Sequence, residues 1–399
     1  MNLDILKERS LKKLKDCDLS YIRSLMYGID WDLRLLGVKG GRGVGKTTLL
    51  LQRLKLMDLP SNEGLYASCD NLWFSKNTLV GLADEFSKQG GRFLFLDEVH
   101  KYPNWSQELK NIYDDYSELN VVFTGSSLLE ILNARADLSR RAIIYDLQGL
   151  SFREYLKMET GYDFRRTDLE TLIEEHVDIA ELIVSEIRPL QYFNDYLKSG
   201  YYPFYRESLS LYHQRIEEIV SLILHIELPL LRNIDVSYIF KIKQLLQIIA
   251  ESVPFVPNVS KLSERIGVNR NTFISYLYYI NEAGLTTNLY KDLKGISRLQ
   301  KPDKIYLDNP NLHWALSSEK PNTGHLRECF FLNQLQYNHK VEYINAGDFK
   351  VDFKYTFEIG GKSKTAKQLG KSKHSYVIPD NIEVGNGNKI PLWVFGFLY

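Results

Sequence analysis

The chain has 399 residues, which is too long for one ordinary domain and fits about two to four, each able to bury its own core. Hydrophobic residues make up 44% and charged residues 25%, a composition that excludes a disordered or fibrous protein. The 50 basic and 50 acidic residues give a formal net charge of zero. Any binding of nucleic acid must therefore depend on local patches, because the chain has no overall positive field.

The sequence has no features of a membrane segment or of an oxidising compartment. No window reaches about 18 uncharged apolar residues, and the first residues are charged where a signal peptide would be apolar. Cys17, Cys69 and Cys329 have no metal-type spacing and suit a reducing compartment. We expect a cytoplasmic protein without a membrane partner.

The first half of the chain predicts a short helical segment followed by an α/β domain. Residues 1–30 read as one or two charged helices. In residues 31–150 short apolar runs alternate with helical stretches, which predicts a parallel sheet with helices on both faces. The expected strands are Leu35–Val38, Leu65–Cys69, Phe93–Leu96, Val121–Thr124 and Ile143–Leu147.

The second half predicts three further parts. Residues 151–252 are helical and rich in aromatic residues, as in a helical lid, and Pro254 and Pro257 then mark a boundary. Residues 253–295 read as two short helices and a strand. Residues 296–399 read as a small α/β unit around the helix Leu326–Leu335. Its expected strands are Lys304–Leu307, Val341–Ile344, Phe349–Val351, Tyr355–Glu358 and Leu392–Phe397.

A phosphate-binding loop is predicted at residues 40–47. The segment fits G-x-x-x-x-G-K-[ST], with an apolar run before it and a helical stretch after it. Backbone N–H groups would bind phosphate oxygens, Lys46 would reach the terminal phosphates, and the Thr47 hydroxyl would ligate magnesium. We therefore expect ATP and Mg²⁺ as cofactors. The predicted nucleotide-binding residues are Gly40, Gly41, Arg42, Gly43, Val44, Gly45, Lys46, Thr47 and Thr48.

Two carboxylates, Asp97 and Glu98, directly follow the apolar run Phe93–Leu96. A buried parallel strand delivers its last side chains to the edge of the sheet where nucleotide crevices form. We expect Asp97 to hold Mg²⁺ through water, together with Thr47. Glu98 is expected to orient and deprotonate the attacking water, with Lys46 as the second catalytic residue.

Hydroxyl residues and two arginines come later in the same domain. Thr124, Ser126 or Ser127 could contact the terminal phosphate, while Ser126 or Ser127 would equally serve as a helix N-cap. Arg140 and Arg141 precede the last strand of this domain. Either could act as an arginine finger on a phosphate of its own or a neighbouring subunit, and a surface salt bridge is the alternative.

These motifs resemble those of a prokaryotic AAA+ ATPase family. The resemblance rests on the phosphate-binding loop, the acidic pair with His100, the segments 124–127 and 138–141, and the run Gly149–Tyr155. It implies ATP hydrolysis and an α/β P-loop AAA+ core. It also implies a winged helix and a small α/β restriction-endonuclease-like C-terminal domain, which together with the helical lid complete the expected fold. The motifs are strong in the first 155 residues and weak beyond them.

Residues 253–295 fit the winged helix. A short helix with Leu262 and Ile266 inward is followed by a turn at Gly267, a second helix and the strand Leu285–Tyr290. The second helix would face the major groove, and nearby cations would contact phosphates. A packing role within the ATPase is the alternative. The candidate DNA contacts are Asn269, Arg270, Asn271, Thr272, Lys291, Lys294 and Arg298.

A candidate second site lies in the C-terminal domain. Nucleases of the PD-(D/E)xK type hold Mg²⁺ with acidic residues on adjacent strands and place a lysine beside the attacking water. Asp348 and Glu358 resemble the carboxylate pair, Glu328 lies on the preceding helix, and Lys362 follows. The lysine comes four residues after Glu358 rather than two, so a glycine bulge must shorten its path. Cleavage and a degenerate, binding-only fold both stay open.

A lysine-rich stretch lies between Ile359 and Pro379. It could bind a nucleic-acid backbone or form a solvated loop. Its members are Lys362, Lys364, Lys367, Lys371 and Lys373.

We predict an AAA+ ATPase that couples ATP hydrolysis to the binding or processing of DNA or RNA. The alternative is a nucleotide-dependent switch that binds a protein partner and has a C-terminal domain that does not cut. An arginine finger acting between subunits would require a homo-oligomer.

Overall fold

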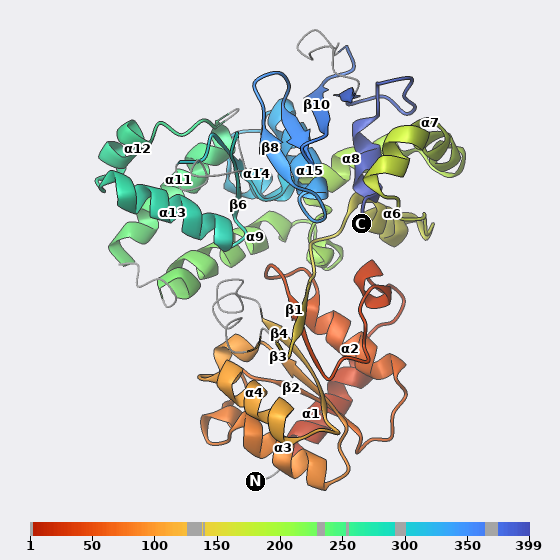
Figure 1. Cartoon of the computed structure of the whole chain (residues 1–399), viewed down its shortest axis with the longest axis vertical. Coiled ribbons are helices and arrows are strands. Elements are labelled where there is room, and N and C mark those ends of the chain that lie inside the picture. The colour runs from red at the N-terminus through yellow and green to blue at the C-terminus, as the bar shows by residue number, and fades with distance from the viewer. Residues whose placement is uncertain are drawn as a thin grey trace. The chain divides into compact units, whose positions relative to one another are not determined.

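The computed structural model describes residues 3–125, 138, 140–229, 236–252, 255–291, 301–363 and 374–399. The chain divides into two compact units, Met1–Gly149 and Leu150–Tyr399, and each is described by itself (Figure 1). The finer division into five parts stays a prediction.

The first unit is built on a five-stranded sheet in which all neighbouring strands run parallel. The strand order is β2-β3-β4-β1-β5. The predicted parallel sheet is confirmed, and each expected strand ends within one residue of the observed one. The strands are β1 (Leu35–Lys39), β2 (Gly64–Ser68), β3 (Phe93–Asp97), β4 (Asn120–Gly125) and β5 (Ile143–Asp146).

Helices cover both faces of this sheet. The helix α2 (Lys46–Leu56) contacts β2, β3 and β4 from one face. Since parallel strands are joined by right-handed crossovers, α3 (Leu79–Lys88) and α4 (Trp105–Asp115), which return in the other direction, lie on the opposite face. The N-terminal helix α1 (Asp4–Asp16) contacts α2 and the edge strand β2.

The central strand β3 shows why these strands read as continuous apolar runs. Leu94 and Leu96 lie in the core cluster formed with α3 and α4, whereas Phe95 points to the other face and is also buried. Both faces of the strand are therefore covered, so it lacks the alternation of a strand with one face in water. Asp97, at its end, is the first polar side chain.

Helices with aromatic residues open the second unit. The ring of Phe152 contacts those of Phe193 and Tyr196, and both of these contact Phe330 on the later helix α15 (Thr323–Leu335). The aromatic residues read as part of a lid thus pack in one core with the C-terminal part of the chain. The helices are α6 (Phe152–Thr160), α7 (Leu169–Glu186), α8 (Pro189–Ser199), α9 (Tyr212–Leu222) and α11 (Ile239–Glu251).

A helix–turn–helix pair follows α11 in the chain. Helix α12 (Val259–Ile266) ends at Gly267, whose φ of 71° lies in the left-handed region, and α13 (Arg270–Glu282) begins three residues later. The strand β6 (Thr286–Leu289) then pairs antiparallel with β7 (Lys304–Leu307). These hydrogen bonds cross the predicted boundary at residue 295, so β7 is joined to the helical pair.

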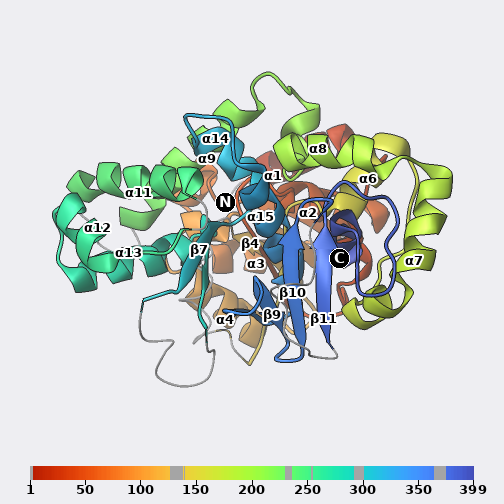
Figure 2. The same ribbon diagram turned by 90° about the horizontal axis from the view of Figure 1, so that it is seen from above.

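A four-stranded mixed sheet occupies the rest of the second unit, in the order β11-β10-β9-β8 (Figure 2). Helix α15 contacts β10, and the ring of Phe331 lies against Phe349 and Phe357 of the sheet. The two neighbouring pairs β8–β9 and β9–β10 are antiparallel, and β10–β11 is parallel. The strands are β8 (Val341–Tyr343), β9 (Phe349–Val351), β10 (Tyr355–Gly360) and β11 (Ser375–Pro379). A short helix, α14 (Pro310–Leu316), precedes α15.

Two expectations for this region were wrong. Leu392–Phe397, expected as a strand, is a buried 3-10 helix that contacts α6, α7 and α15. A short continuous apolar run does not reveal whether it is a buried strand or a buried helix. The strand β11 was not predicted at all, although it forms an edge of the sheet.

Among the described residues, no helix is both long enough and apolar enough to span a bilayer.

Candidate nucleotide-binding site

The phosphate-binding loop lies between the end of β1 and the start of α2, as its sequence context predicts. Gly43 and Gly45 have φ of 83° and 100°, values that glycine adopts without strain. At Gly40 a Cβ atom would lie 2.2 Å from the carbonyl oxygen of Leu147, so any side chain there would collide with backbone. Helix α2 begins at Lys46, which directs its N-terminus to the loop and favours an anion there.

Lys46 carries its positive charge into the loop. The residue is buried, and Nζ donates to the carbonyl oxygens of Gly40 at 2.9 Å and Gly41 at 2.8 Å. The backbone of the loop itself therefore holds the ammonium group at the position where terminal phosphates are expected. A buried cation at a loop of this kind provides a favourable site for phosphate oxygens.

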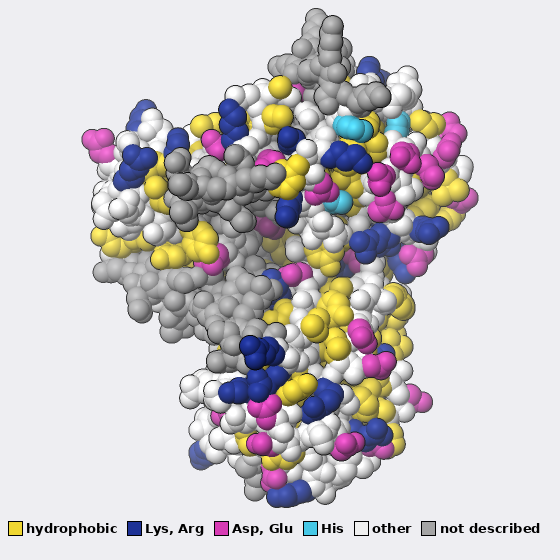
Figure 3. Space-filling view, viewed as in Figure 1, with side chains coloured by type: hydrophobic (Ala, Val, Ile, Leu, Met, Phe, Trp, Pro, Cys, Tyr) yellow, Lys and Arg dark blue, Asp and Glu magenta, His cyan; other side chains and the backbone are white. Residues whose placement is uncertain are grey.

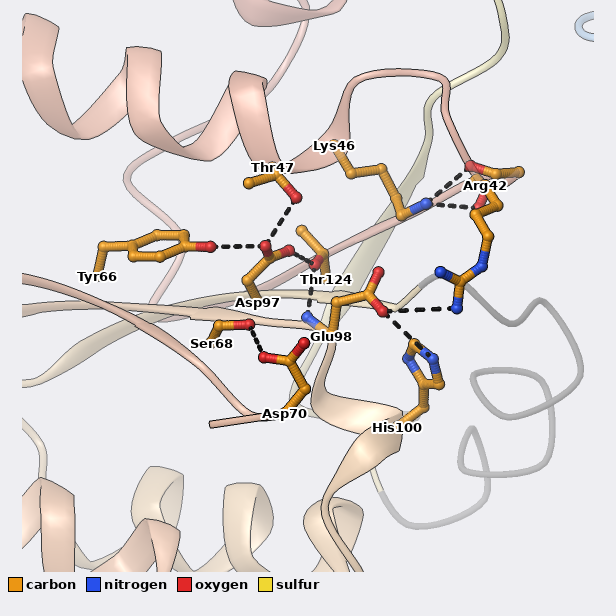
Figure 4. A network of polar contacts seen from close by, with 12 residues as sticks. Arg42, Lys46, Thr47, Tyr66, Ser68, Asp70, Asp97, Glu98, His100 and Thr124 are labelled. Atoms are coloured by element: carbon orange, nitrogen blue, oxygen red, sulfur yellow. Dashed lines mark hydrogen bonds and ion pairs between the residues drawn. The ribbon is translucent and has the colours of Figure 1, made fainter. Parts of the chain in front are cut away.

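Asp97 is a buried carboxylate at the end of β3 that accepts hydrogen bonds from three hydroxyl groups (Figure 4). Oδ2 accepts from Thr47 Oγ1 at 2.7 Å and from Tyr66 Oη at 2.7 Å. Oδ1 accepts from Thr124 Oγ1. The register of β2 and β3 pairs Tyr66 with Phe95, which puts Tyr66 and Asp97 on the sheet face that α2 covers.

The pair Thr47 and Asp97 fits a magnesium ion. Their side-chain oxygens lie 2.7 Å apart, so one small cation can face both, directly or through water. Hydroxyl and carboxylate oxygens are the hard ligands that Mg²⁺ prefers, and Mg²⁺ usually keeps several waters. The predicted ligands are therefore brought together, next to the loop that would hold the phosphates.

Glu98 points toward the same site. Its backbone has φ of 55°, a conformation uncommon outside glycine, and its N–H donates to Thr124 Oγ1 at 3.0 Å. Glu98 Oε2 lies 3.8 Å from Arg42 Nη2. Burial raises the pKa of Glu98, and the positive charges of Lys46 and Arg42 oppose that rise. A carboxylate with a raised pKa is a stronger base toward water than an ordinary glutamate.

His100 lies beside Glu98 but adds no positive charge at neutral pH. Its Nε2 is 3.7 Å from Glu98 Oε2. Burial lowers the pKa of His100 to about 3, and the charges of Lys101, Lys46 and Arg42 lower it further. The ionic partner of Glu98 in this pair of contacts is therefore Arg42, while His100 stays a neutral ring.

Thr124 is fully buried and joins the two acidic residues, since its hydroxyl donates to Asp97 and accepts from the Glu98 N–H. This arrangement positions the acidic pair, and it does not place Thr124 at a phosphate. Ser126 and Ser127, the other candidates for phosphate contact, lie outside the described residues.

Tyr66 is the site residue that the sequence analysis missed. The pattern of β2 shows an apolar strand with an internal tyrosine, and nothing in it gives the register with β3. Only the pairing of the strands shows that this hydroxyl reaches Asp97.

The predicted arginine fingers lie near the start of the strands, at the end of the sheet opposite the phosphate-binding loop. Both precede β5, whose residue Ile143 pairs with Leu36, so roughly 13 Å of strand separates them from the loop at Gly40. Arg141 donates to Asp114 through Nε at 2.8 Å and Nη2 at 2.9 Å, and Arg140 is exposed. Arg141 thus makes a surface ion pair, and a finger role would require the phosphate of a second subunit.

The predicted second site is brought together only in part. Asp348 directly precedes β9 and Glu358 lies on the adjacent β10, but Asp348 Oδ2 accepts the N–H of Ile359 at 2.7 Å. Glu328 Oε2 accepts from Tyr306 Oη at 2.5 Å. Lys362 lies past the end of β10 and is exposed, and the other four lysines of the stretch lie outside the described residues. No three described His, Cys, Asp or Glu residues are placed to hold a metal ion.

The geometry defines a P-loop nucleotide-binding site on a parallel sheet. Residues 33–156 match the family described as AAA domain. The segment that holds the site is therefore similar to AAA-type ATPase domains.

Matches that cover more of the chain have low sequence identity or low structural similarity. The chain is 26% identical over 318 residues to an uncharacterized protein of Methanocaldococcus jannaschii; the match covers 76% of this chain and 63% of that protein. The Walker-type ATPase of Pyrococcus abyssi is similar with a TM-score of 0.38 and 13% identity, over 78% and 95% of the two chains. The Aeropyrum pernix ORC1 protein, solved in complex with DNA, has a TM-score of 0.33 and 12% identity, over 81% and 91%.

The raised pKa of Glu98 predicts the acid side of the pH profile. If Glu98 deprotonates the attacking water, hydrolysis needs the charged carboxylate, and kcat/KM should fall as the pH drops through a value above the usual 4.5 of glutamate. Arg42→Gln removes a charge that lowers this pKa and should move the fall to higher pH. Arg92→Gln, an exposed arginine paired with Glu63, is the control and should leave it in place. A fall at or below 4.5, or one that Arg42→Gln does not move, would contradict the assignment.

Proposed function

We propose that the protein hydrolyses ATP with Mg²⁺ and that hydrolysis is coupled to the binding of DNA or RNA. The observation that supports hydrolysis most directly is the arrangement of Thr47, Asp97 and Glu98 beside the phosphate-binding loop, with 2.7 Å between the Thr47 and Asp97 oxygens. A site that only bound nucleotide would not need a second, partly buried carboxylate next to the first.

Each residue has a distinct task in this mechanism. Lys46 and the backbone N–H groups of the loop bind the terminal phosphates and offset their charge. Thr47 and Asp97 would hold Mg²⁺, which when bound would supply further charge neutralisation at the phosphates. Glu98 accepts the proton of the attacking water at its carboxylate, and Arg42 holds that carboxylate until phosphate competes for the guanidinium.

Replacing Glu98 with Gln tests the enzymatic part. The amide keeps the shape of the side chain but cannot take a proton, so ATP turnover should fall by about 100-fold or more while ATP binding persists. We would measure turnover and binding for both proteins, with and without double-stranded DNA, single-stranded DNA and RNA, across a salt series. Salt-sensitive stimulation by one nucleic acid supports the coupling. Stimulation by none of them would favour the alternative, a switch for a protein partner.

The coupling rests on the helix pair α12–α13. Phe273, Leu277 and Ile280 of α13 are buried, whereas Arg270 and Asn271 at its start are exposed. Lys and Arg side chains are visible over the region of α11, α12 and α13 in Figure 3. A helix that begins with exposed basic and amide side chains, after a tight turn, is the arrangement with which helix-turn-helix proteins meet the major groove.

The contact set for nucleic acid is narrower than the sequence suggested. The Asn269 side chain accepts the N–H of Thr272 at 2.9 Å and so serves as the N-cap of α13. Lys291 is exposed at the end of β6, while Lys294 and Arg298 lie outside the described residues. Arg270 and Asn271 are therefore the best candidates for contact with bases or phosphates.

Arg270→Ala tests this surface. If Arg270 binds a phosphate, the variant should bind DNA or RNA more weakly at low salt, and the slope of log K against log salt should decrease by about 1. Fluorescence anisotropy with labelled oligonucleotides measures both. Arg165→Ala removes an exposed arginine outside the helix pair and is the charge-matched control. Equal binding by the two variants would exclude this use of α13.

An arginine finger between subunits is part of the same proposal, and it requires a homo-oligomer. Arg141→Ala should lower turnover and leave ATP binding intact, because the arginine would act only on the transition state. Mixing Arg141→Ala with Glu98→Gln should raise turnover above that of either variant alone, since some sites would combine an intact Glu98 with an intact finger. Mixtures that stay inactive would show that Arg141 serves only its ion pair with Asp114.

Nuclease activity is left out of the proposal. Glu328, Asp348 and Glu358 do not form a three-residue metal cluster among the described residues, and two of them already accept hydrogen bonds from the protein. The geometry fits the degenerate, binding-only form of the domain better than a cutting one.

A further inference from the structure

Tyr66 lies between the N-terminal helix and the acidic pair. The ring is buried on β2, and its hydroxyl donates to Asp97 Oδ2 at 2.7 Å, the same oxygen that accepts from Thr47. On the other side, Lys13 Nζ of α1 donates to Tyr66 Oη at 3.2 Å and lies 4.7 Å from the centre of the ring. Helix α1 also accepts the backbone N–H of Tyr66 through Ser10 Oγ at 3.0 Å.

These contacts fix the direction of the hydroxyl proton. An ammonium group has donors only, so Tyr66 Oη must accept from Lys13. A carboxylate has acceptors only, so the proton of Tyr66 must point to Asp97. The hydroxyl of Tyr66 is therefore oriented by Lys13 and by Asp97, and it is not free to rotate away from Asp97.

The hydrogen bond from Tyr66 to Asp97 differs from the other two because Tyr66 has no proposed contact with magnesium or with Glu98. Thr47 is needed as a magnesium ligand, and Thr124 is shared between Asp97 and the Glu98 N–H. When Thr47 turns its oxygen toward a cation, its bond to Asp97 is weakened, while that from Tyr66 need not change. Outer partners of this kind orient metal-binding carboxylates, and their loss typically lowers metal affinity or activity about 10- to 100-fold.

We propose that Tyr66 is a positioning residue for magnesium: held in place by helix α1, it keeps the Asp97 carboxylate aimed at the cation beside Thr47. The inference rests on the proposed function, because it assumes that Asp97 takes part in Mg²⁺ binding. It adds a role for the N-terminal helix, which would contribute to the magnesium site through the contacts of Lys13 and Ser10 with Tyr66.

Tyr66→Phe removes the hydroxyl and keeps the ring. The matched control is Tyr116→Phe, which also removes a hydroxyl that donates to a carboxylate, Asp84, at 3.3 Å in the same unit. We would titrate binding of a fluorescent ATP analogue with Mg²⁺, starting from a chelator, and measure turnover at each Mg²⁺ concentration. Tyr66→Phe should bind the analogue normally in chelator and need about tenfold more Mg²⁺ for half of the Mg²⁺-dependent change.

A second variant tests the connection to α1 without altering the buried ring. Lys13→Met should shift the Mg²⁺ requirement in the same direction by about threefold, since it removes one hydrogen bond to Tyr66. Lys12→Met, one residue earlier on the exposed part of the helix, is its control. Should Tyr66→Phe lose its fold, the comparison of Lys13→Met with Lys12→Met decides the question.

The outcomes separate this inference from the proposed function. A Mg²⁺ requirement of Tyr66→Phe within twofold of Tyr116→Phe, in a wild type that responds to Mg²⁺, overturns the role of Tyr66 alone. Equal loss of binding in chelator and in Mg²⁺ would show a structural role and overturn it too. A wild type that binds and hydrolyses ATP without any Mg²⁺ response overturns the proposed magnesium chemistry, and this inference with it.

Discussion

The buried carboxylate of Asp97 is the group around which the nucleotide-binding unit is arranged. A charge taken out of water without partners costs several kcal/mol, so the fold must supply hydrogen bonds to it. It does so with three hydroxyls from three elements: Thr47 at the start of α2, Tyr66 on β2 and Thr124 on β4. These bonds lock the end of β3 to both neighbouring strands and to the helix that follows the phosphate-binding loop. The structure that stabilises Asp97 is thus also the one that aligns the site.

Glu98 is likewise held in place by other residues of the site. Its backbone is held by the Thr124 hydroxyl, and its carboxylate is close to Arg42 of the loop and to a neutral His100. Because Arg42 belongs to the predicted phosphate-binding loop, a bound nucleotide could compete directly for the partner of Glu98, the proposed catalytic carboxylate. The second unit is organised differently. Ser151 and Arg153 both donate to the backbone oxygen of Tyr399, so the start of this unit anchors the last residues of the chain.

The sequence determined the local chemistry of the first unit. The pattern of residues 40–47 and the run ending in Asp97 and Glu98 predict a loop, a helix and a strand whose positions the structure reproduces, because glycine torsions and apolar runs are short-range signals. The same pattern predicts that the sheet is parallel, but it does not predict the order of the strands in it. In the second unit the local signals are weaker, and Leu392–Phe397 was assigned the wrong secondary structure since its burial comes from α6, α7 and α15.

The tertiary structure alone decided which side chains meet. Tyr66 and Asp97 are 31 residues apart, and only the register of β2 with β3 brings hydroxyl and carboxylate together. Arg141 is 27 residues from Asp114, yet the parallel sheet places both at the end of the strands opposite the loop. Residue type and spacing identify groups that can do chemistry, whereas strand pairing and burial determine their partners and the pKa of a group such as Glu98. Those depend on contacts between distant parts of the chain, which no short segment encodes.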